Sequence, residues 1–127
     1  MKFEVYRETQ FSSAHHLRNY CGKCENVHGH NWRVRLCVTR EKLNETGFVM
    51  DFKDLDGVLK KITTILDHRD LNSLPQFEKT NPTAENIALF IFNEAKKEIF
   101  LIDELVKVSK VSVWESEKSC ACVRGKV

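Results

Sequence analysis

Side chains around residue 30 repeat with a period of two, and this alternation constrains the fold more than any other feature of the chain. The apolar positions are Trp32, Val34, Leu36 and Val38, and Arg33, Arg35 and Thr39 alternate with them on the other face. Successive side chains of a β-strand point to opposite faces, so the pattern predicts a strand over about 30–40 with one apolar face. His28 and His30 share the parity of the apolar set and are expected to point towards the core.

The first segment of the chain has the same period. Phe3, Val5 and Phe11 occupy odd positions among mostly polar neighbours, which predicts a strand over about 2–12. His15 has this parity and His16 does not. We therefore expect His15 to face inward and His16 to face outward.

Three inward histidines suggest a metal site. His15, His28 and His30 can offer three neutral imidazoles to one ion, and three protein ligands with an open fourth position are typical of catalytic zinc. Imidazole also suits copper, iron and nickel, so the identity of the metal stays open. The alternative is that His15 is a satisfied core histidine and that the other two are a chance pair.

Two helical patterns occupy the middle of the chain. Asp51 can cap a helix beginning at Phe52, and Asn81 followed by Pro82 is typical of a second helix start. The apolar stripes are Phe52, Leu55, Val58, Leu59, Ile62, Ile65 and Leu66 in the first helix, and Ala84, Ile87, Ala88, Ile91, Ala95 and Ile99 in the second. Both stripes have the spacing of one face of an α-helix.

Two further strands are expected at the end of the chain. One contains Val111, Val113 and Glu115, and the other covers 119–127. The order ββααββ predicts an α+β fold in which two helices cover one face of an antiparallel sheet. We expect a single domain over residues 1–127.

Composition excludes several classes of function. Twenty basic and eighteen acidic side chains leave a formal net charge of +2, and no basic stripe suggests a nucleic-acid footprint. No apolar run has the length of a membrane span, and the first residues have the pattern of a strand rather than a signal peptide. The expected location is the cytoplasm, and neither a nucleic acid nor a membrane is an expected partner.

The cysteines allow a rival zinc site. Cys21 and Cys24 are separated by two residues, and Cys120 and Cys122 by one, so four thiolates could hold a structural zinc. Such a chain would be a non-catalytic zinc-binding interaction module, but the three histidines would then have no role. A Cys21–Cys24 redox pair is a further alternative, although the surrounding pattern is not that of a redox βαβ unit.

Three further residues allow both a structural and a functional interpretation. Glu115 puts a carboxylate on an apolar strand face, where it is either a partly exposed strand end or an acceptor for paired N–H donors of a pterin-like ring. Asp67 and His68 follow directly on the first helix. They are either a helix-end histidine and its neighbour or a carboxylate-oriented imidazole that shares proton transfer with Cys24.

Several sequence blocks, taken together, resemble the 6-pyruvoyl-tetrahydropterin synthase family, which includes the 6-carboxytetrahydropterin synthases of queuosine biosynthesis. The blocks are Phe11-Ser-Ser-Ala-His15, Cys24-x-x-x-His28-Gly-His30-Asn31, Thr46-Gly-Phe-Val-Met-Asp51-Phe52, Leu66-Asp-His68-Arg-Asp-Leu-Asn72, Pro82-Thr-Ala-Glu-Asn86 and Val113-Trp-Glu115. They span nearly the whole chain in the order of the family.

The resemblance implies roles for individual residues. His15, His28 and His30 would bind zinc, Cys24 would be the catalytic thiol, Asp67 and His68 its proton-transfer partners, and Glu115 the anchor of the pterin ring. Thr83 and Glu85 would lie near the substrate.

The resemblance also implies an assembly and a substrate. The fold would be the tunnelling fold, in which three subunits join their sheets into a barrel and two trimers stack into a homohexamer with active sites between subunits. The substrate would be 7,8-dihydroneopterin triphosphate. The basic residues that would hold the triphosphate stay open, with Lys23, Arg69 and Lys118 as candidates.

Glu25 leaves the product open. Because it follows Cys24 directly, the sequence contains both Cys-x-x-x-His-Gly-His, which resembles members that form carboxy or pyruvoyl products, and Glu-x-x-His-Gly-His. The second pattern resembles members in which a glutamate replaces the thiol and the product is 6-hydroxymethyl-7,8-dihydropterin, a folate precursor. Glu25 is then a catalytic residue, or else a solvated loop residue.

Overall fold

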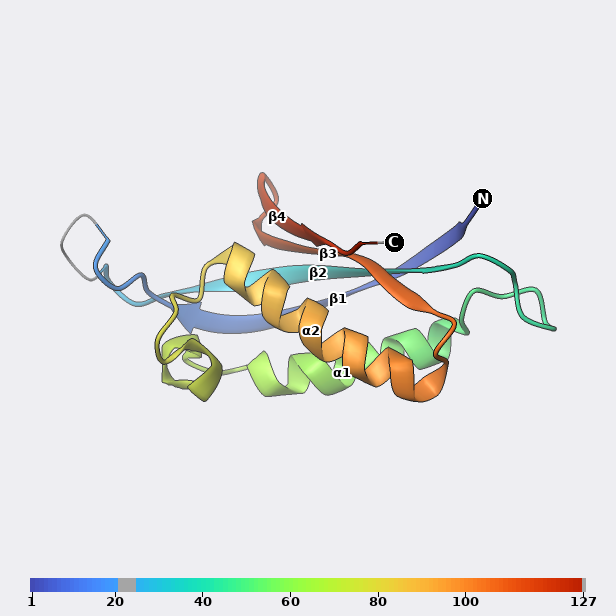
Figure 1. Ribbon diagram of the computed structural model, residues 1–127. Coiled ribbons are helices and arrows are strands. Elements are labelled where there is room, and N and C mark those ends of the chain that lie inside the picture. Colours follow the sequence, from blue (N-terminus) through green and yellow to red (C-terminus); the bar gives the residue numbers. More distant parts are fainter. Residues whose placement is uncertain (21–24, 127) are drawn as a thin grey trace.

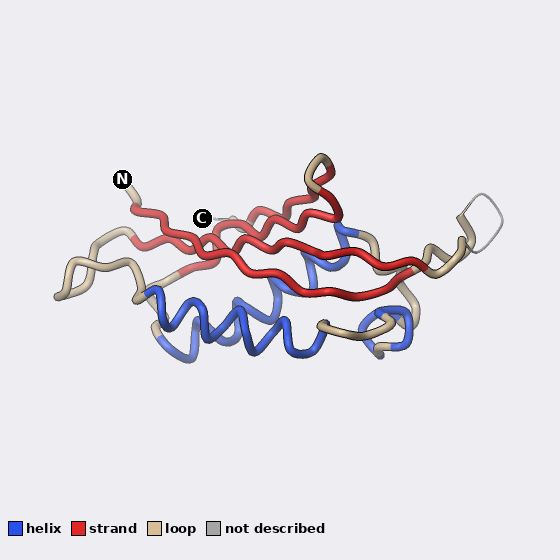
Figure 2. The backbone as a smooth tube through the Cα atoms, turned by 180° about the vertical axis from the view of Figure 1, so that it is seen from behind, coloured by secondary structure: helices blue, strands red, loops and turns tan. Residues whose placement is uncertain are grey.

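A computed structural model describes residues 1–20 and 25–126 of the chain. Four antiparallel strands form one sheet in the order β1-β2-β3-β4, and two helices cover one face of it (Figure 1). Seen from behind, both helices again lie on the same side of the sheet (Figure 2). The ββααββ order and the α+β class predicted from periodicity are confirmed. No helix among the described residues is long and apolar enough to cross a membrane.

The first two strands are longer than predicted at the end that carries the histidines. β1 is Phe3–His15 and β2 is His28–Arg40, and their antiparallel register pairs His15 with His28. The predicted limits of about 2–12 and 30–40 were short because the polar residues at these ends interrupt the apolar alternation. The backbone ladder does not need apolar side chains, so it continues through both histidines.

The last two strands also differ from the prediction at their ends. β3 is Lys107–Ser116 and begins before its predicted apolar stretch, whereas β4 is Ser119–Arg124 and ends before residue 127. The β3–β4 register shifts between Trp114 and Ser116, so a bulge lies at Glu115.

The helices have the predicted apolar faces except at Phe52, which is 49% exposed because it lies at the first position of α1. α1 is Phe52–Leu66, and the Asp51 side chain accepts a hydrogen bond from the Lys53 N–H, as expected of an N-cap. α2 is Ala84–Ile102, and here the predicted Asn81 cap is wrong. The cap is Thr83, which accepts from the Asn86 N–H, because the Asn81 side chain is hydrogen-bonded to the backbone of Arg18 instead.

The core lies between the helices and the sheet. Trp32, Val34, Leu36, Val111 and Val113 face the helices from the two central strands and are fully buried. Two short 3₁₀ turns, η1 (Leu71–Ser73) and η2 (Pro75–Phe77), connect the helices and contribute Leu71 and Phe77 to the same core. The sheet therefore has one face packed under helices and one face without them.

Truncating a core side chain tests this arrangement. Leu36→Ala removes a fully buried side chain and is expected to lower the free energy of unfolding by about 2–5 kcal/mol, measured by urea titration. Leu101→Ala is the matched control because that side chain is 79% exposed at the end of α2, and it is expected to cost less than about 0.5 kcal/mol. Equal losses in the two variants would contradict the assigned core.

Candidate metal centre

Three histidines and one carboxylate meet at one end of the sheet, on the face that the helices cover. The ligand atoms of His15, His28, His30 and Glu115 all lie within 4.8 Å of one another. His15 Nε2 is 3.1 Å from His28 Nε2 and 3.2 Å from Glu115 Oε1, and His30 Nε2 is 3.3 Å from the same carboxylate oxygen. Strand parity predicted that the three histidines converge and that Glu115 lies on an apolar strand face, and the structure brings the four side chains together.

Strand pairing produces this convergence. β1 ends at His15, β2 begins at His28, and the two are directly opposite each other in the ladder. His30 follows two residues later on the same face, and β3 brings Glu115 in from the other side of β2. Each donor is therefore held by a strand rather than by a loop, which fixes its direction.

Hydrogen bonds orient two of the imidazoles. His15 Nδ1 lies 2.8 Å from the Pro82 carbonyl oxygen, and His28 Nδ1 lies 2.9 Å from the Asn26 carbonyl oxygen. A carbonyl can only accept, so each Nδ1 carries the hydrogen and each Nε2 of the neutral ring keeps its lone pair. This is the arrangement expected of metal-binding histidines, whose second nitrogen donates to a carbonyl or carboxylate.

His30 supplies the test of whether a metal fits. Its Nε2 is buried and has no hydrogen-bond partner among the described residues, since the nearby Glu115 oxygen lies outside hydrogen-bonding geometry. Burial lowers the pKa of His30, an effect that the Glu115 carboxylate opposes. A neutral nitrogen aimed at two other imidazole nitrogens and a carboxylate fits a divalent ion of the zinc type.

Glu115 also lines a surface cavity, whose strand residues Gln10, Arg33 and Trp114 lie on the helix-free face of the sheet. The cavity has a volume of about 640 Å³ and is lined by Gln10, Asn31, Arg33, Trp114, Glu115, Ser116 and Glu117. The Glu115 side chain is 35% exposed, and the Arg33 guanidinium stacks on the Trp114 ring at 3.9 Å. The Glu115 carboxylate oxygen Oε1 itself lies beside His15 and His30.

Asp67 and His68 form a separate dyad beyond the end of α1. Asp67 Oδ1 accepts from the Ser12 N–H at 2.8 Å, and Asp67 Oδ2 is 3.0 Å from His68 Nδ1. The bond from Ser12, with a smaller contribution from His68, lowers the pKa of Asp67. His68 has a positive φ of 54° and its side chain is 83% exposed, so its ring projects away from the core.

Of the catalytic candidates around residue 25, Glu25 is described and Cys24 lies outside the described residues, as does Cys21. Glu25 Oε1 accepts from the Leu17 N–H at 3.1 Å and lies 3.9 Å from His28 Nδ1. Glu25 is therefore hydrogen-bonded to the chain beside the metal group, with 31% of its side chain exposed.

The two remaining predicted substrate residues lie at the start of α2. Thr83 is the N-cap and Glu85 is exposed in the first turn. Sequence reasoning missed the residue before them, Pro82, whose carbonyl orients His15. No side-chain pattern signals a contact that a backbone carbonyl makes.

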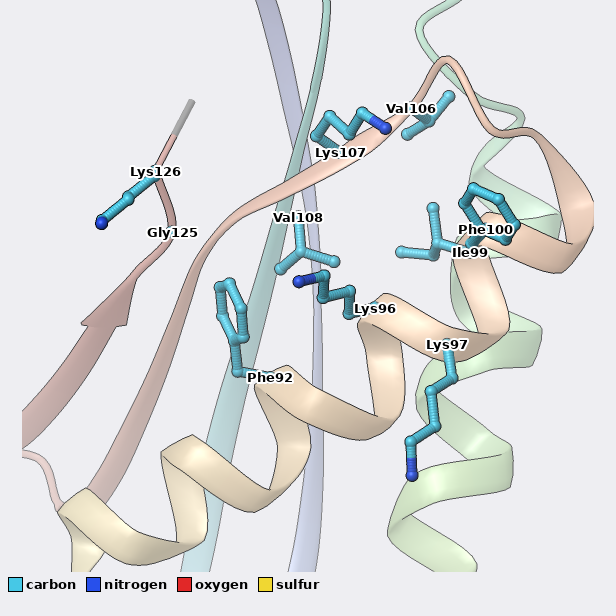
Figure 3. Close-up of a pocket in the computed structure, with 10 residues that line it drawn as sticks. All are labelled: Phe92, Lys96, Lys97, Ile99, Phe100, Val106, Lys107, Val108, Gly125 and Lys126. Carbon is cyan, nitrogen blue, oxygen red and sulfur yellow. The ribbon is translucent and has the colours of Figure 1, made fainter.

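Other features lie away from the metal group. Cys120 and Cys122 lie on the helix-free face of β4, with sulfur atoms 3.9 Å apart, and Cys37 is buried within β2. A second cavity, of about 500 Å³, lies at the opposite end of β3 between that strand and α2 (Figure 3). Its lining includes Phe92, Lys96 and Val108 and none of the predicted site residues.

Comparisons with known proteins agree on one family. The family model for 6-pyruvoyl tetrahydropterin synthase matches residues 4–126. A putative 6-carboxy-5,6,7,8-tetrahydropterin synthase of Archaeoglobus fulgidus is 37% identical over 116 residues, or 91% of this chain and 90% of that protein. A dihydroneopterin monophosphate aldolase of Pyrococcus furiosus is 33% identical over 118 residues, or 93% and 94% of the two chains.

A solved structure has the same fold. The 6-pyruvoyl tetrahydropterin synthase of Caenorhabditis elegans superposes with a TM-score of 0.82, covering 99% of this chain and 97% of that one, at 23% identity.

The Asp67–Ser12 bond predicts a pH-dependent stability. Asp67 has a folded-state pKa below its ordinary value of 3.8, so the stabilisation is present above that value and is lost as pH falls through the folded pKa. Asp67→Asn is therefore expected to be less stable than the parent protein at pH 7, with a smaller difference at pH 3. Urea unfolding at the two pH values measures this, with Glu45→Gln, in an exposed turn, as control. A difference independent of pH would contradict the assignment.

Proposed function

Because the chain belongs to the 6-pyruvoyl tetrahydropterin synthase family, we propose that it is a zinc-dependent enzyme of the 6-carboxy-5,6,7,8-tetrahydropterin synthase type. Its substrate would be 7,8-dihydroneopterin triphosphate, and its reaction a step in queuosine and other 7-deazapurine biosynthesis. One observation carries the proposal, the convergence of three imidazoles and Glu115 at the end of the sheet. Similarity over 91% of the chain to the Archaeoglobus fulgidus relative supports it.

The proposed zinc ligands are His15, His28 and His30. When bound, zinc would supply Lewis-acid chemistry, lowering the pKa of a substrate hydroxyl that it touches. The protein holds the ligands ready for this, because two of the three imidazoles are oriented by carbonyl groups and His15 is 2% exposed.

Glu115 is the proposed anchor of the pterin ring. A carboxylate accepts two parallel N–H bonds, which matches the adjacent ring and amino nitrogens of a pterin. Its position at the edge of a cavity lined by Arg33 and Trp114 is consistent with this role. Thr83 and Glu85 stay candidates for further substrate contacts.

Proton transfer is assigned to Asp67, His68 and Cys24. Asp67 stays ionised because the Ser12 N–H binds its carboxylate, and it holds the Nδ1 hydrogen of His68. The exposed Nε2 of His68 is then free to take up or release a proton. Cys24 is proposed as the thiolate base by resemblance alone. The family assembly, a homohexamer with sites between subunits, and a cytoplasmic location likewise remain predictions.

A second candidate product comes from carbon–carbon cleavage that leaves 6-hydroxymethyl-7,8-dihydropterin. The named aldolase relative supports it, and Glu25 lies beside His28. A 6-pyruvoyl product is the remaining alternative within the family. The alternative of another class is a zinc module built on cysteines. Two of its ligands, Cys120 and Cys122, lie on the sheet face opposite to the histidines.

A product assay tests the proposed reaction. Zinc-loaded protein is incubated with 7,8-dihydroneopterin triphosphate without oxygen, and the pterins and released aldehyde are identified by mass. We expect 6-carboxy-5,6,7,8-tetrahydropterin with acetaldehyde. Hydroxymethyldihydropterin as the main product would replace the proposed function with the folate-type reaction, and no turnover would reject both.

Zinc affinity tests the ligand set. His30→Ala removes one ligand and is expected to weaken zinc binding by more than about 100-fold, since even partners that only orient ligands are worth 10–100-fold. Competition with a chromogenic chelator measures the change. Cys120→Ala is the control and should leave the affinity unchanged; the reverse result would support the cysteine-built module.

A further inference from the structure

The backbone N–H and carbonyl groups of residues 16–18, which follow His15, are all hydrogen-bonded to residues outside this segment. The Asn72 side chain accepts from the His16 N–H at 2.9 Å and donates to the His16 carbonyl at 3.0 Å. The Asn81 side chain does the same to Arg18, at 2.8 and 3.1 Å. Each amide therefore imitates the pairing of a neighbouring β-strand.

Glu25 binds the residue between them. The Leu17 N–H donates to Glu25 Oε1 at 3.1 Å, and the Glu25 N–H donates to the Leu17 carbonyl at 3.0 Å. We call Glu25, Asn72 and Asn81 the clamp. Along residues 16–18, the first and third residues are therefore bound by asparagine side chains and the middle residue is bound by Glu25.

The clamp is itself braced. The Arg18 guanidinium donates to the carbonyls of Thr80 and Asn72, at 3.2 and 3.0 Å. Asn86 donates to the Asn81 carbonyl at 2.9 Å. The turns between the two helices and the start of α2 are therefore tied to the segment that leaves β1.

The location of the clamp connects it to the metal group. Leu17 lies two residues after His15, and Glu25 lies three residues before His28. Their reciprocal bonds close the connection between β1 and β2 just beyond the His15–His28 pair. This closure limits the separation of two proposed zinc ligands that belong to different strands.

We propose that Glu25 is a positioning residue of the metal centre, which acts with Asn72 and Asn81 to hold the ends of β1 and β2, and is not the catalytic base. Glu25 Oε1 accepts a hydrogen bond from the Leu17 N–H. The nearest His28 nitrogen, Nδ1, donates to the Asn26 carbonyl and not to Glu25. A general base must present a carboxylate oxygen to the proton that it removes, and since Oε1 accepts from Leu17, Glu25 could do so only through Oε2. For turnover, the inference rests on the proposed function, and it gives Glu25 a role different from the two that the sequence left open.

Two substitutions separate the roles. Glu25→Gln keeps an oxygen that can accept from Leu17 but cannot act as a base, whereas Glu25→Ala loses both abilities. We expect Glu25→Gln to retain zinc affinity, kcat and amide exchange at Leu17 within about threefold. We expect Glu25→Ala to speed Leu17 exchange at least about tenfold and to weaken zinc binding, because a charge-assisted bond to a partly buried backbone group is lost.

The measurements are hydrogen exchange by NMR, a zinc titration and the product assay with separate kcat and KM values. Glu45→Ala, which removes an exposed glutamate elsewhere, is the matched control. Asn72→Ala and Asn81→Ala provide second variants and should weaken zinc binding in the same direction as Glu25→Ala.

Two outcomes would overturn the inference. One is a loss of more than about 100-fold in kcat for Glu25→Gln with zinc affinity and Leu17 exchange unchanged, which would identify a base. The other is unchanged Leu17 exchange in Glu25→Ala. If the parent protein shows no turnover, the proposed function fails, but the exchange and zinc measurements still decide the positioning role.

Discussion

The antiparallel register of β1 and β2 is the constraint on which the rest of this structure depends. Pairing His15 with His28 places Phe11, Trp32 and His30 on one face, so the core and the metal group belong to a single continuous surface. A slip of one residue in either strand would turn that strand's histidines towards the helix-free face. The site is therefore an extension of the hydrophobic core, with imidazoles where the apolar side chains end.

This placement has an energetic consequence. His15 is buried against Trp32, and His30 has a buried nitrogen without a hydrogen-bond partner among the described residues. Burying an unsatisfied polar atom costs about 1–3 kcal/mol, so the metal-free arrangement is destabilised relative to one in which an ion takes the lone pairs. Binding would then stabilise the fold as well as equip it for chemistry.

Periodicity predicted most of the fold and the direction of the metal group, because side-chain parity follows directly from strand and helix geometry. It did not predict the strand ends and the helix cap, which depend on individual polar contacts. The ends of β1 and β2 continue through polar residues, Thr83 replaces Asn81 as the cap, and Asn81 instead holds Arg18, 63 positions away. Such contacts depend on how distant segments meet, which local patterns do not contain. Cys24, the predicted thiol, lies outside the described residues.

The central claim is that three imidazoles, and no thiolate, hold the metal. X-ray absorption spectroscopy of the zinc-loaded protein tests it most directly. We predict a first coordination shell of nitrogen and oxygen atoms at about 2.0–2.1 Å with the multiple-scattering pattern of imidazole rings. A sulfur shell at about 2.3 Å would contradict the claim and would show that cysteine thiolates bind the zinc.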